Sequence, residues 1–324
     1  MKILMTGGAG YLGSVLSLQL TKAGHEVRVF DCLLYGGESL LSLAGQPGFE
    51  FRRGDVRDSQ AVRGAVEGVD AVVHLASIVG DPACARQPEL AREVNLKASL
   101  ELIKAAQEAG AGRFVFASTC SNYGKMTDTT VLATEESELR PVSLYAETKV
   151  GVERELLKLP RHPMSGTVMR FSTLYGLSPR MRFDLTVNEF VMEMMLQRKL
   201  VVYGEQFWRP YVHVRDAARA VAMVLEAPTE QVAGQVFNVG DTRENYRKAD
   251  LLDLIRMRIP DGEVESVPKA EDPRDYRVSF ERIRARLGYT ITRRVSDGIG
   301  EIATALEAGL IDDPRSPAHY NVKP

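Results

Sequence analysis

The sequence contains few cysteines and no strong excess of charge. Its 324 residues include only Cys32, Cys84 and Cys120, which lie far apart and form no Cys-x-x-Cys pair. This spacing signals neither a disulfide framework nor a metal site, and it fits a reducing, cytoplasmic setting. The 41 Lys and Arg residues are balanced by 43 Asp and Glu residues. Because no broad positive surface is expected, nucleic acid is not an expected partner.

Long hydrophobic runs are also absent from the sequence. No apolar run approaches the roughly 18 residues that a membrane-spanning helix requires. The N-terminal apolar stretch leads directly into glycines and is too short for the hydrophobic region of a secretory signal. We therefore expect a soluble protein with no membrane partner. Its length permits a substantial core within one large or two modest domains.

The first half of the chain alternates short apolar runs with longer amphipathic stretches, a pattern typical of β-α-β units in a parallel sheet. The six expected strands are Lys2–Thr6, Glu26–Asp31, Phe49–Arg53, Ala71–Leu75, Arg113–Ser118 and Thr167–Phe171. The four expected helices are Tyr11–Ala23, Gln60–Val66, Pro88–Ala109 and Ser143–Leu157. The predicted fold class is therefore α/β, with a doubly wound, Rossmann-like sheet in residues 1–171. Residues 172–324, which are punctuated by prolines, are expected to form mainly a smaller substrate-binding subdomain, with later returns of the chain to the sheet.

A glycine-rich turn follows the first expected strand and opens the first helix. Its spacing is G-x-x-G-x-x-G through Gly7, Gly10 and Gly13, and it encloses Tyr11 and Leu12. At such a turn, free backbone N–H groups and the helix dipole can bind a dinucleotide pyrophosphate. Gly7 would permit the sharp turn, Gly10 the approach of the phosphate, and Gly13 the packing of helix on strand. We expect all five residues to contact the cofactor.

An acidic residue ends the second expected strand, about 20 residues after the turn, as a dinucleotide site requires. The carboxylate of Asp31 would accept hydrogen bonds from ribose hydroxyls and would repel a 2′-phosphate. The sequence therefore favours NAD over NADP.

Residues after the third and fourth expected strands fit the same cofactor. They are Asp55 and Val56 on the adenine side, and Leu75, Ala76 and Ser77 on the nicotinamide side. Asn95 lies within an expected helix although asparagine is a poor helix former. Two interpretations of Asn95 stay open: a locally bonded amide, or a support for the backbone of the active site.

Tyr145 and Lys149 lie one helical turn apart on the same face of the fourth expected helix. A phenol with a pKa near 10 must lose about three pKa units, or roughly 4 kcal/mol, to act as a base near neutral pH. An ammonium about 5 Å away, at an effective dielectric of about 20, supplies roughly 3 kcal/mol. We therefore expect Lys149 to lower the pKa of Tyr145, with the positive charge of oxidised nicotinamide completing the shift.

The fifth expected strand leads into a polar turn that ends at Gly124. Such a turn lies at the carboxyl edge of the sheet, where ligands bind. A hydroxyl in this turn can hydrogen-bond both a substrate oxygen and the phenol, which stabilises the oxygen as it gains or loses a proton.

Taken together, these segments resemble the extended short-chain dehydrogenase/reductase family, specifically its nucleotide-sugar epimerases and dehydratases. The segments that carry the resemblance are Thr6–Gly13, Gly54–Arg57, His74–Ala76, Ser118–Gly124, Tyr145–Lys149, Arg170–Gly176 and Arg209–Val214. The resemblance implies an NAD cofactor that also contacts Tyr145 and Lys149, a nucleotide-diphosphate sugar as substrate, and a homodimer. It assigns the active-site hydroxyl to Thr119, so the implied catalytic residues are Thr119, Tyr145 and Lys149.

The resemblance also bears on the reaction. Family members that dehydrate sugars carry an Asp-Glu pair directly after the active-site hydroxyl, and the decarboxylases carry a Glu, whereas this chain has Cys120 and Ser121. Because neither side chain can perform carboxylate chemistry at its ordinary pKa, both reactions are disfavoured. Cys120 is either an acid/base thiol, although the thiol of the epimerase-reductases falls one position later, or a small buried structural thiol. Together with Thr119, both residues are candidate substrate contacts.

Further substrate contacts follow from the resemblance. Arg209 would bind the diphosphate, a bidentate task suited to a guanidinium. Asn188 matches a substrate-side asparagine, and Thr173 stands where relatives usually have Asn. Asp272 and Arg274 lie in a segment that resembles the one closing over the nucleotide, with a plain surface loop as the alternative.

The leading hypothesis is an NAD-dependent epimerase that acts at C4 through a transient 4-keto sugar. A nucleotide-4-keto-sugar reductase is the main alternative within the family. A non-catalytic, NAD-sensing protein of the same fold is a third possibility, and the intact set of Thr119, Tyr145 and Lys149 argues against it.

Overall fold

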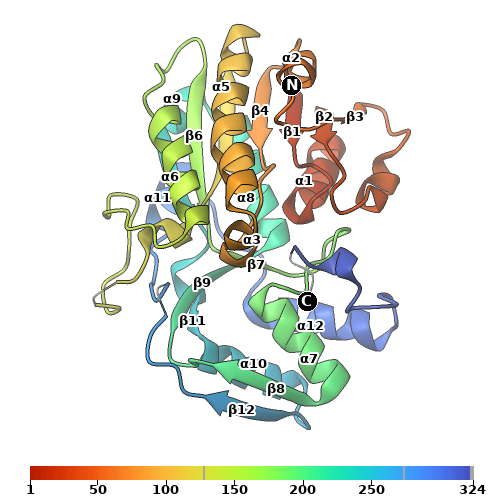
Figure 1. The fold of residues 1–324 in the computed structure, drawn as a ribbon, viewed down its shortest axis with the longest axis vertical. Coiled ribbons are helices and arrows are strands. Elements are labelled where there is room, and N and C mark those ends of the chain that lie inside the picture. The colour runs from red at the N-terminus through yellow and green to blue at the C-terminus, as the bar shows by residue number, and fades with distance from the viewer. Residues whose placement is uncertain (127, 273, 322–324) are drawn as a thin grey trace.

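The computed structural model describes residues 1–126, 128–272 and 274–321. A large parallel sheet flanked by helices forms the part of the molecule that contains the N-terminus, and a smaller region of helices and short strands lies against one end of it (Figure 1). This arrangement confirms the predicted α/β class with a Rossmann-like sheet.

Seven parallel strands form the large sheet in the order β10-β6-β5-β4-β1-β2-β3. Their bounds are β1 Lys2–Thr6, β2 Glu26–Asp31, β3 Phe49–Arg53, β4 Ala71–His74, β5 Arg113–Thr119, β6 Ser165–Phe171 and β10 Gln235–Val239. The first six agree with the expected strands to within two residues at either end. The seventh, β10, is a return of the second half of the chain to the sheet.

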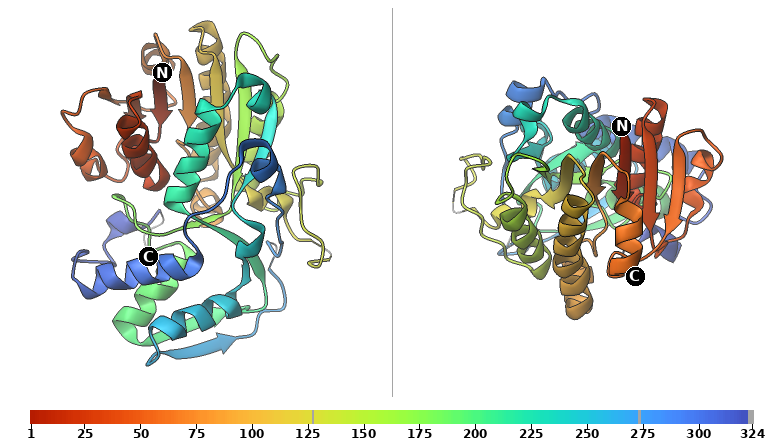
Figure 2. Two further views of the ribbon diagram at one scale, coloured as in Figure 1. Left: turned by 180° about the vertical axis from the view of Figure 1, so that it is seen from behind. Right: turned by 90° about the horizontal axis from the view of Figure 1, so that it is seen from above.

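Helices cover both faces of this sheet, as the view from above shows (Figure 2). Successive residues of β1 explain why, because Ile3 and Met5 belong to one apolar core and Leu4 to the other. In the first core, the helices that flank this sheet include α1 Tyr11–Lys22 and α8 Val214–Glu226. In the second core they are α2 Ser59–Val66, α5 Ala98–Glu108 and α6 Leu144–Leu156. The shorter helices are α3 Asp81–Arg86, α4 Pro88–Arg92, α9 Thr229–Val232 and α11 Glu281–Leu287. No helix within the described ranges is long and apolar enough to cross a membrane.

One expected helix is interrupted. The predicted continuous helix over 88–109 is wrong in detail, because a π-helical turn, Glu93–Lys97, separates α4 from α5. Asn95 lies within this turn, and its buried side chain bonds to the loop after β4 instead of to solvent. Such turns are frequently found at functional sites.

The smaller region is built from two further sheets and three helices. A three-stranded sheet contains β7 Thr173–Tyr175, β9 Trp208–His213 and β11 Asn245–Arg247, and a parallel pair contains β8 Lys199–Tyr203 and β12 Glu263–Val267. The helices are α7 Thr186–Gln197, α10 Lys248–Arg258 and α12 Val295–Glu307.

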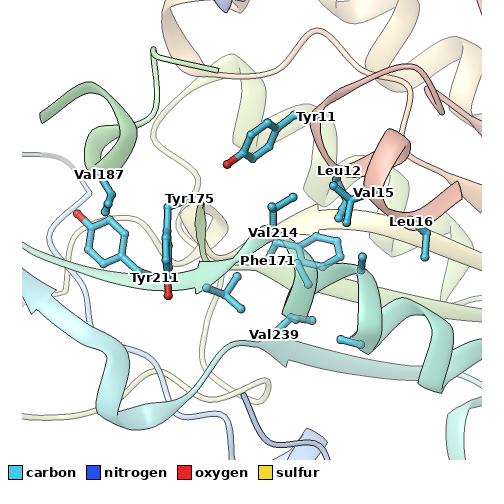
Figure 3. Packing of buried hydrophobic residues seen from close by; sticks show 14 of the residues in the cluster. Tyr11, Leu12, Val15, Leu16, Phe171, Tyr175, Val187, Tyr211, Val214 and Val239 are labelled. Carbon is cyan, nitrogen blue, oxygen red and sulfur yellow. The ribbon is translucent and has the colours of Figure 1, made fainter. Parts of the chain in front are cut away.

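The two regions share a continuous apolar core. Tyr11 at the start of α1 belongs to the same buried cluster as Tyr175 on β7 and Tyr211 on β9, and all three lie close together in Figure 3. The phenol of Tyr11 donates a hydrogen bond to the carbonyl of Gly176 at 2.6 Å. The end of β1 is thereby joined directly to the smaller region.

A buried ion pair connects helix α6, which carries Tyr145 and Lys149, to the sheet. Glu153 on α6 and Arg170 on β6 lie 2.7 Å apart between Oε2 and Nη2, and both residues are at most 4% exposed. The same carboxylate accepts hydrogen bonds from Ser118 at the end of β5 and, at 2.8 Å, from Asn122 in the turn that follows. One acidic side chain thus joins α6, β5, β6 and the polar turn.

We expect Glu153→Gln to lower the free energy of unfolding by about 3–5 kcal/mol, because it leaves the buried guanidinium of Arg170 without its counter-charge. Chemical denaturation of the full-length protein measures this loss. Glu155→Gln on the same helix is the matched control, since Glu155 pairs with Lys158 at the surface and should contribute no more than about 1 kcal/mol. Equal losses in the two variants would contradict the importance assigned to the buried pair.

Candidate active site

A cavity of about 380 Å³ lies at the carboxyl ends of the parallel strands. It is lined by residues that follow β1, β2, β3, β4 and β5. The strand order reverses direction between β1 and β4, and such a switch point is where open α/β sheets bind their ligands.

The glycine-rich turn forms one end of this cavity. Gly7 has a φ of +74°, and a Cβ placed there would lie 2.6 Å from the backbone N of Ala76. A Cβ at Gly13 would collide with the carbonyl oxygen of Gly7, whereas a Cβ at Gly10 would meet only that same oxygen, at 3.2 Å. The turn is thus closely packed against other backbone at Gly7 and Gly13, whereas Gly10 leaves open space. A phosphate can approach the backbone N–H groups there. Tyr11 and Leu12 also line the cavity.

Asp31 lies beside this turn at the end of β2. Its carboxylate accepts hydrogen bonds from the backbone N of Ala9 at 3.0 Å and of Leu33 at 2.8 Å. Burial nevertheless raises its pKa above the ordinary value, against the effect of these two bonds. Each oxygen keeps a lone pair for a ribose hydroxyl, so the residues present fit a dinucleotide.

Asp55 and Val56 line the same end of the cavity. The carboxylate of Asp55 is bound by Arg57 at 2.7 Å, and this bond is the main reason that the pKa of Asp55 is lowered. Because the charge of Arg57 is balanced in this way, it offers little attraction to a 2′-phosphate. The pair is therefore compatible with NAD.

The loop after β4 runs along the cavity through Leu75, Ala76 and Ser77. Asn95 does not line the cavity but holds this loop from behind. Its Oδ1 accepts from the hydroxyl of Ser77 at 2.9 Å and from the backbone N of Ile78 at 2.7 Å, and its amide donates to the carbonyl of Ile78 at 3.0 Å. Of the two interpretations of Asn95, the geometry favours backbone support.

Thr119, Tyr145 and Lys149 all line the opposite end of the cavity. Ser143 caps α6 through its hydroxyl, which sets the start of the helix that carries Tyr145 and Lys149. The ammonium of Lys149 donates to the carbonyl of Ala117 at 2.8 Å and lies 5.8 Å from the ring centroid of Tyr145. The hydroxyl oxygen of Thr119 accepts from the backbone N of Ser121 at 3.1 Å, which leaves its own proton free to donate.

The pKa values of Tyr145 and Lys149 are shifted mainly by burial. Burial lowers the pKa of Lys149 to about 8. Burial also raises the pKa of Tyr145, helped by the nearby Cys84. Desolvation therefore dominates both pKa values, and Lys149 alone does not make the phenol of Tyr145 acidic.

Only some of the polar residues expected on the substrate side line the cavity. Ser121 and Thr173 line the cavity. Cys120 lies behind the wall, fully buried, with its Sγ 3.2 Å from the carbonyl oxygen of Arg170 and a pKa that burial raises. Its geometry is that of a structural thiol and corrects its expected placement as a substrate contact. Asn188 also lies outside the cavity lining.

Asn188 is fully buried, and its amide donates to the phenol oxygen of Tyr11 at 3.1 Å and to the carbonyl of Arg182 at 2.8 Å. Its Oδ1 accepts from the backbone N of Gly176 at 2.9 Å. The side chain thus positions the loop between β7 and α7 instead of reaching into the cavity.

Arg209, Asp272 and Arg274 lie together but do not line the cavity. The guanidinium of Arg209 is 2.8 Å from the carboxylate of Asp272. Arg274 is 3.2 Å from the carboxylate of Asp81, which in turn accepts from the hydroxyl of Ser143 at 2.7 Å. The segment that carries Asp272 and Arg274 is therefore tied to the N-terminus of α6.

Several cavity residues were not anticipated from the sequence. They are Tyr35, Arg180, Arg182, Leu185, Tyr276 and Asn321. They reach the cavity through contacts between distant segments, and no local motif marks them. A weak signal was the Arg-Met-Arg run at 180–182, which places two cations in the loop between β7 and α7.

Comparison with known proteins agrees with this geometry. The profile of the NAD dependent epimerase/dehydratase family matches residues 3–240. A dTDP-glucose 4,6-dehydratase from Actinoplanes sp. is 33% identical over 320 residues, which cover 93% of this chain and 96% of the relative. A UDP-glucose 4-epimerase from Streptomyces lividans is 27% identical over 312 residues, which cover 90% of this chain and 92% of the relative.

Solved structures show the same likeness. DesIV, a dTDP-glucose 4,6-dehydratase from Streptomyces venezuelae solved with NAD bound, has a TM-score of 0.82 at 27% identity, covering 95% of this chain and 98% of its own. The UDP-glucose 4-epimerase of Thermus thermophilus in complex with NAD has a TM-score of 0.82 at 26% identity, covering 95% of this chain and 99% of its own. From its cavity, its glycine turn and these matches, we conclude that the chain belongs to the NAD dependent epimerase/dehydratase family, whose cofactor is NAD.

Proposed function

We propose that the protein is a nucleotide-sugar epimerase that acts at C4. The observation that carries this proposal is the composition of the catalytic end of the cavity. Thr119, Tyr145 and Lys149 line it, and the carboxylates among the described lining residues are Asp31 and Asp55, which both belong to the opposite, adenosine end. The site can move a proton at an oxygen, but it holds no second acid and base among the described residues.

Epimerisation requires little more than this set. The phenol oxygen of Tyr145 takes the proton of the C4 hydroxyl and later returns it, while the hydroxyl of Thr119 hydrogen-bonds the same sugar oxygen. The ammonium of Lys149, together with the positive charge that oxidised NAD would bring, would stabilise the phenolate against the desolvation that raises the pKa of Tyr145. The glycine-rich turn and Asp31 would hold NAD, which would supply the acceptor for the hydride from C4 and, once reduced, its donor. Rotation of the 4-keto sugar between the two transfers exchanges the face that is attacked.

Dehydration is less well supported, although dehydratases are among the relatives. Loss of water across C5 and C6 requires a base for the C5 proton and an acid for the departing C6 hydroxyl. Cys120 is buried behind the wall with a raised pKa, and Ser121 is a neutral hydroxyl whose oxygen lies 3.4 Å from the phenol oxygen of Tyr276. Neither side chain can fill these roles.

A nucleotide-4-keto-sugar reductase is the second candidate, because the same three residues could protonate a ketone. It would need a fresh reduced cofactor in each turnover, and Asp31 disfavours NADPH. A non-catalytic sensor would not need Lys149 buried beside Tyr145. On the substrate side, we propose that Arg209 binds the diphosphate and that the segment with Asp272 and Arg274 closes over the nucleotide. The homodimer stays a prediction.

The proposal is tested by incubating the full-length protein with UDP-glucose, dTDP-glucose and a panel of other nucleotide sugars, without added reductant. An epimerase interconverts a pair of C4 epimers with no change in mass. A product lighter by one water would instead identify a dehydratase. In a parallel incubation with a nucleotide-4-keto sugar and reduced dinucleotide, stoichiometric consumption of the dinucleotide would identify a reductase. Chromatography with mass detection separates these outcomes.

Tyr145→Phe should lower kcat by a factor of about 10²–10⁴, because it removes the group that exchanges the proton. The affinity for NAD, measured by calorimetry, should change little. Tyr123→Phe is the matched control, since Tyr123 is a buried tyrosine that donates to Asn238 and does not line the cavity. Unchanged activity in Tyr145→Phe would show that Tyr145 is not the group that exchanges the proton.

Lys149→Met should abolish activity and also raise the melting temperature of the cofactor-free protein, by about 2 °C or more at pH 7. The reason is that Lys149 is buried with its pKa lowered from 10.5 to about 8, so its charge opposes folding below pH 8. As the pH rises from 8 to 10.5, Lys149 loses its proton in the folded wild type before it does so in the unfolded chain, and the wild type gains stability. The difference in melting temperature between Lys149→Met and the wild type should therefore narrow over this range. Calorimetry at several pH values from 7 to 10.5 measures the two melting temperatures. A lower melting temperature for Lys149→Met than for the wild type at pH 7 would contradict the prediction.

A further inference from the structure

The cationic side chains of the cavity suggest a further binding residue. Among the described residues, those that line it are Arg57, Lys149, Arg180 and Arg182. Arg57 is bound to Asp55, and Arg182 to Asp184 at 2.8 Å. Lys149 serves the catalytic phenol. Arg180 has neither an acidic partner within the described ranges nor a role in the proposed reaction.

Arg180 is buried although no carboxylate among the described residues lies within ion-pair distance of it, and Asp184 acts on it only at longer range. Arg180 is 6% exposed, and its guanidinium lies 4.1 Å from the centroid of the Tyr35 ring. One terminal nitrogen donates to the carbonyl of Tyr320 at 3.4 Å, whereas the buried Nε has no hydrogen-bond partner among the described residues. Burial, followed by the neighbouring Arg182, lowers the pKa of Arg180 to about 10. A buried cation with an unbonded N–H group lowers the stability of the fold unless a ligand supplies the missing hydrogen bond and negative charge.

The position of Arg180 indicates which part of a ligand it faces. Tyr35 lies four residues after Asp31, on the adenosine side of the cavity. The loop that carries Arg180 packs against the first turn of α1, where the hydroxyl of Ser178 donates to the carbonyl of Tyr11 at 2.7 Å. Arg180 therefore belongs to the same end of the cavity as the glycine-rich turn and not to the end that holds Tyr145.

This end lacks positive charge for a pyrophosphate. The two phosphates of a dinucleotide carry two negative charges, whereas the N-terminus of α1 offers the equivalent of about half a positive charge. The turn from Thr6 to Gly13 contains no Lys or Arg. A guanidinium with free N–H groups is the side chain that best complements phosphate oxygens.

We propose that Arg180 binds the pyrophosphate of NAD and supplies the positive charge that the glycine-rich turn lacks. The C-terminal segment positions the surroundings of Arg180. The phenol of Tyr35 donates to the carbonyl of Asn321 at 3.4 Å, and the backbone N of Asn321 donates to Asp184 at 3.2 Å. This role requires only the cofactor and is independent of the reaction proposed above.

The test compares ligands with and without phosphate on the full-length protein freed of bound dinucleotide. Calorimetry with NAD, ADP and adenosine should show that Arg180→Gln weakens NAD and ADP by roughly 10- to 100-fold and leaves adenosine unchanged. Arg57→Gln is the control, because it removes a cavity cation that Asp55 already balances, and its effect on ADP should be much smaller. Because no turnover is measured, the result stands whether or not the protein is an epimerase.

Three outcomes would overturn the proposal. Unchanged affinity for ADP in Arg180→Gln would show that Arg180 does not bind phosphate. Equal losses for ADP and adenosine would show that the variant only alters the shape of the cavity. Unchanged NAD affinity together with weakened binding of a nucleotide sugar, measured by the same calorimetry, would assign Arg180 to a substrate anion. If Arg180→Gln fails to fold, a crystal structure of the wild type with NAD decides, since a guanidinium beyond hydrogen-bond distance of every phosphate oxygen excludes the role.

Discussion

The arrangement of the active site depends on the buried ion pair between Glu153 and Arg170. The carboxylate is bound by groups from β5, β6 and the polar turn, so the helix that carries it cannot shift without leaving a charge unpaired. Lys149 precedes Glu153 by one helical turn, and Thr119 follows Ser118 directly. The catalytic ammonium and hydroxyl are thus placed by a pair that does not itself line the cavity.

The site contains two desolvated cations, and the rest of the fold must compensate for them. Neither Lys149 nor Arg180 has a carboxylate partner among the described residues, and burial lowers the pKa of both. Two apolar cores, one on each face of the sheet, provide the stability that such groups reduce. Both cations line the cavity, so the protein gives up stability at positions that face a ligand-sized space.

The first half of the fold could be predicted because its signals are local. Strands such as β2 and helices such as α1 carry their full hydrophobic period within a few residues, and both were predicted to within one residue. The short strands β7 and β11 were not predicted, since three residues are too few to show a period and their pairing partner, β9, is distant in sequence. The π-helical turn at Asn95 was missed because it depends on the loop after β4, which no helix propensity describes.

The order of residues alone was sufficient for the fold class, the glycine turn with Asp31, and the pairing of Tyr145 with Lys149. Each of these follows from spacing within one turn or one strand, where geometry is nearly independent of context. Only the folded chain decides that Cys120 lies behind the wall, that Arg209 is bound by Asp272, and that Arg180 enters the cavity. It also decides that burial prevails over the lysine at Tyr145. Desolvation and ion pairing depend on which distant segments surround a group, and that information is absent from any single stretch of sequence.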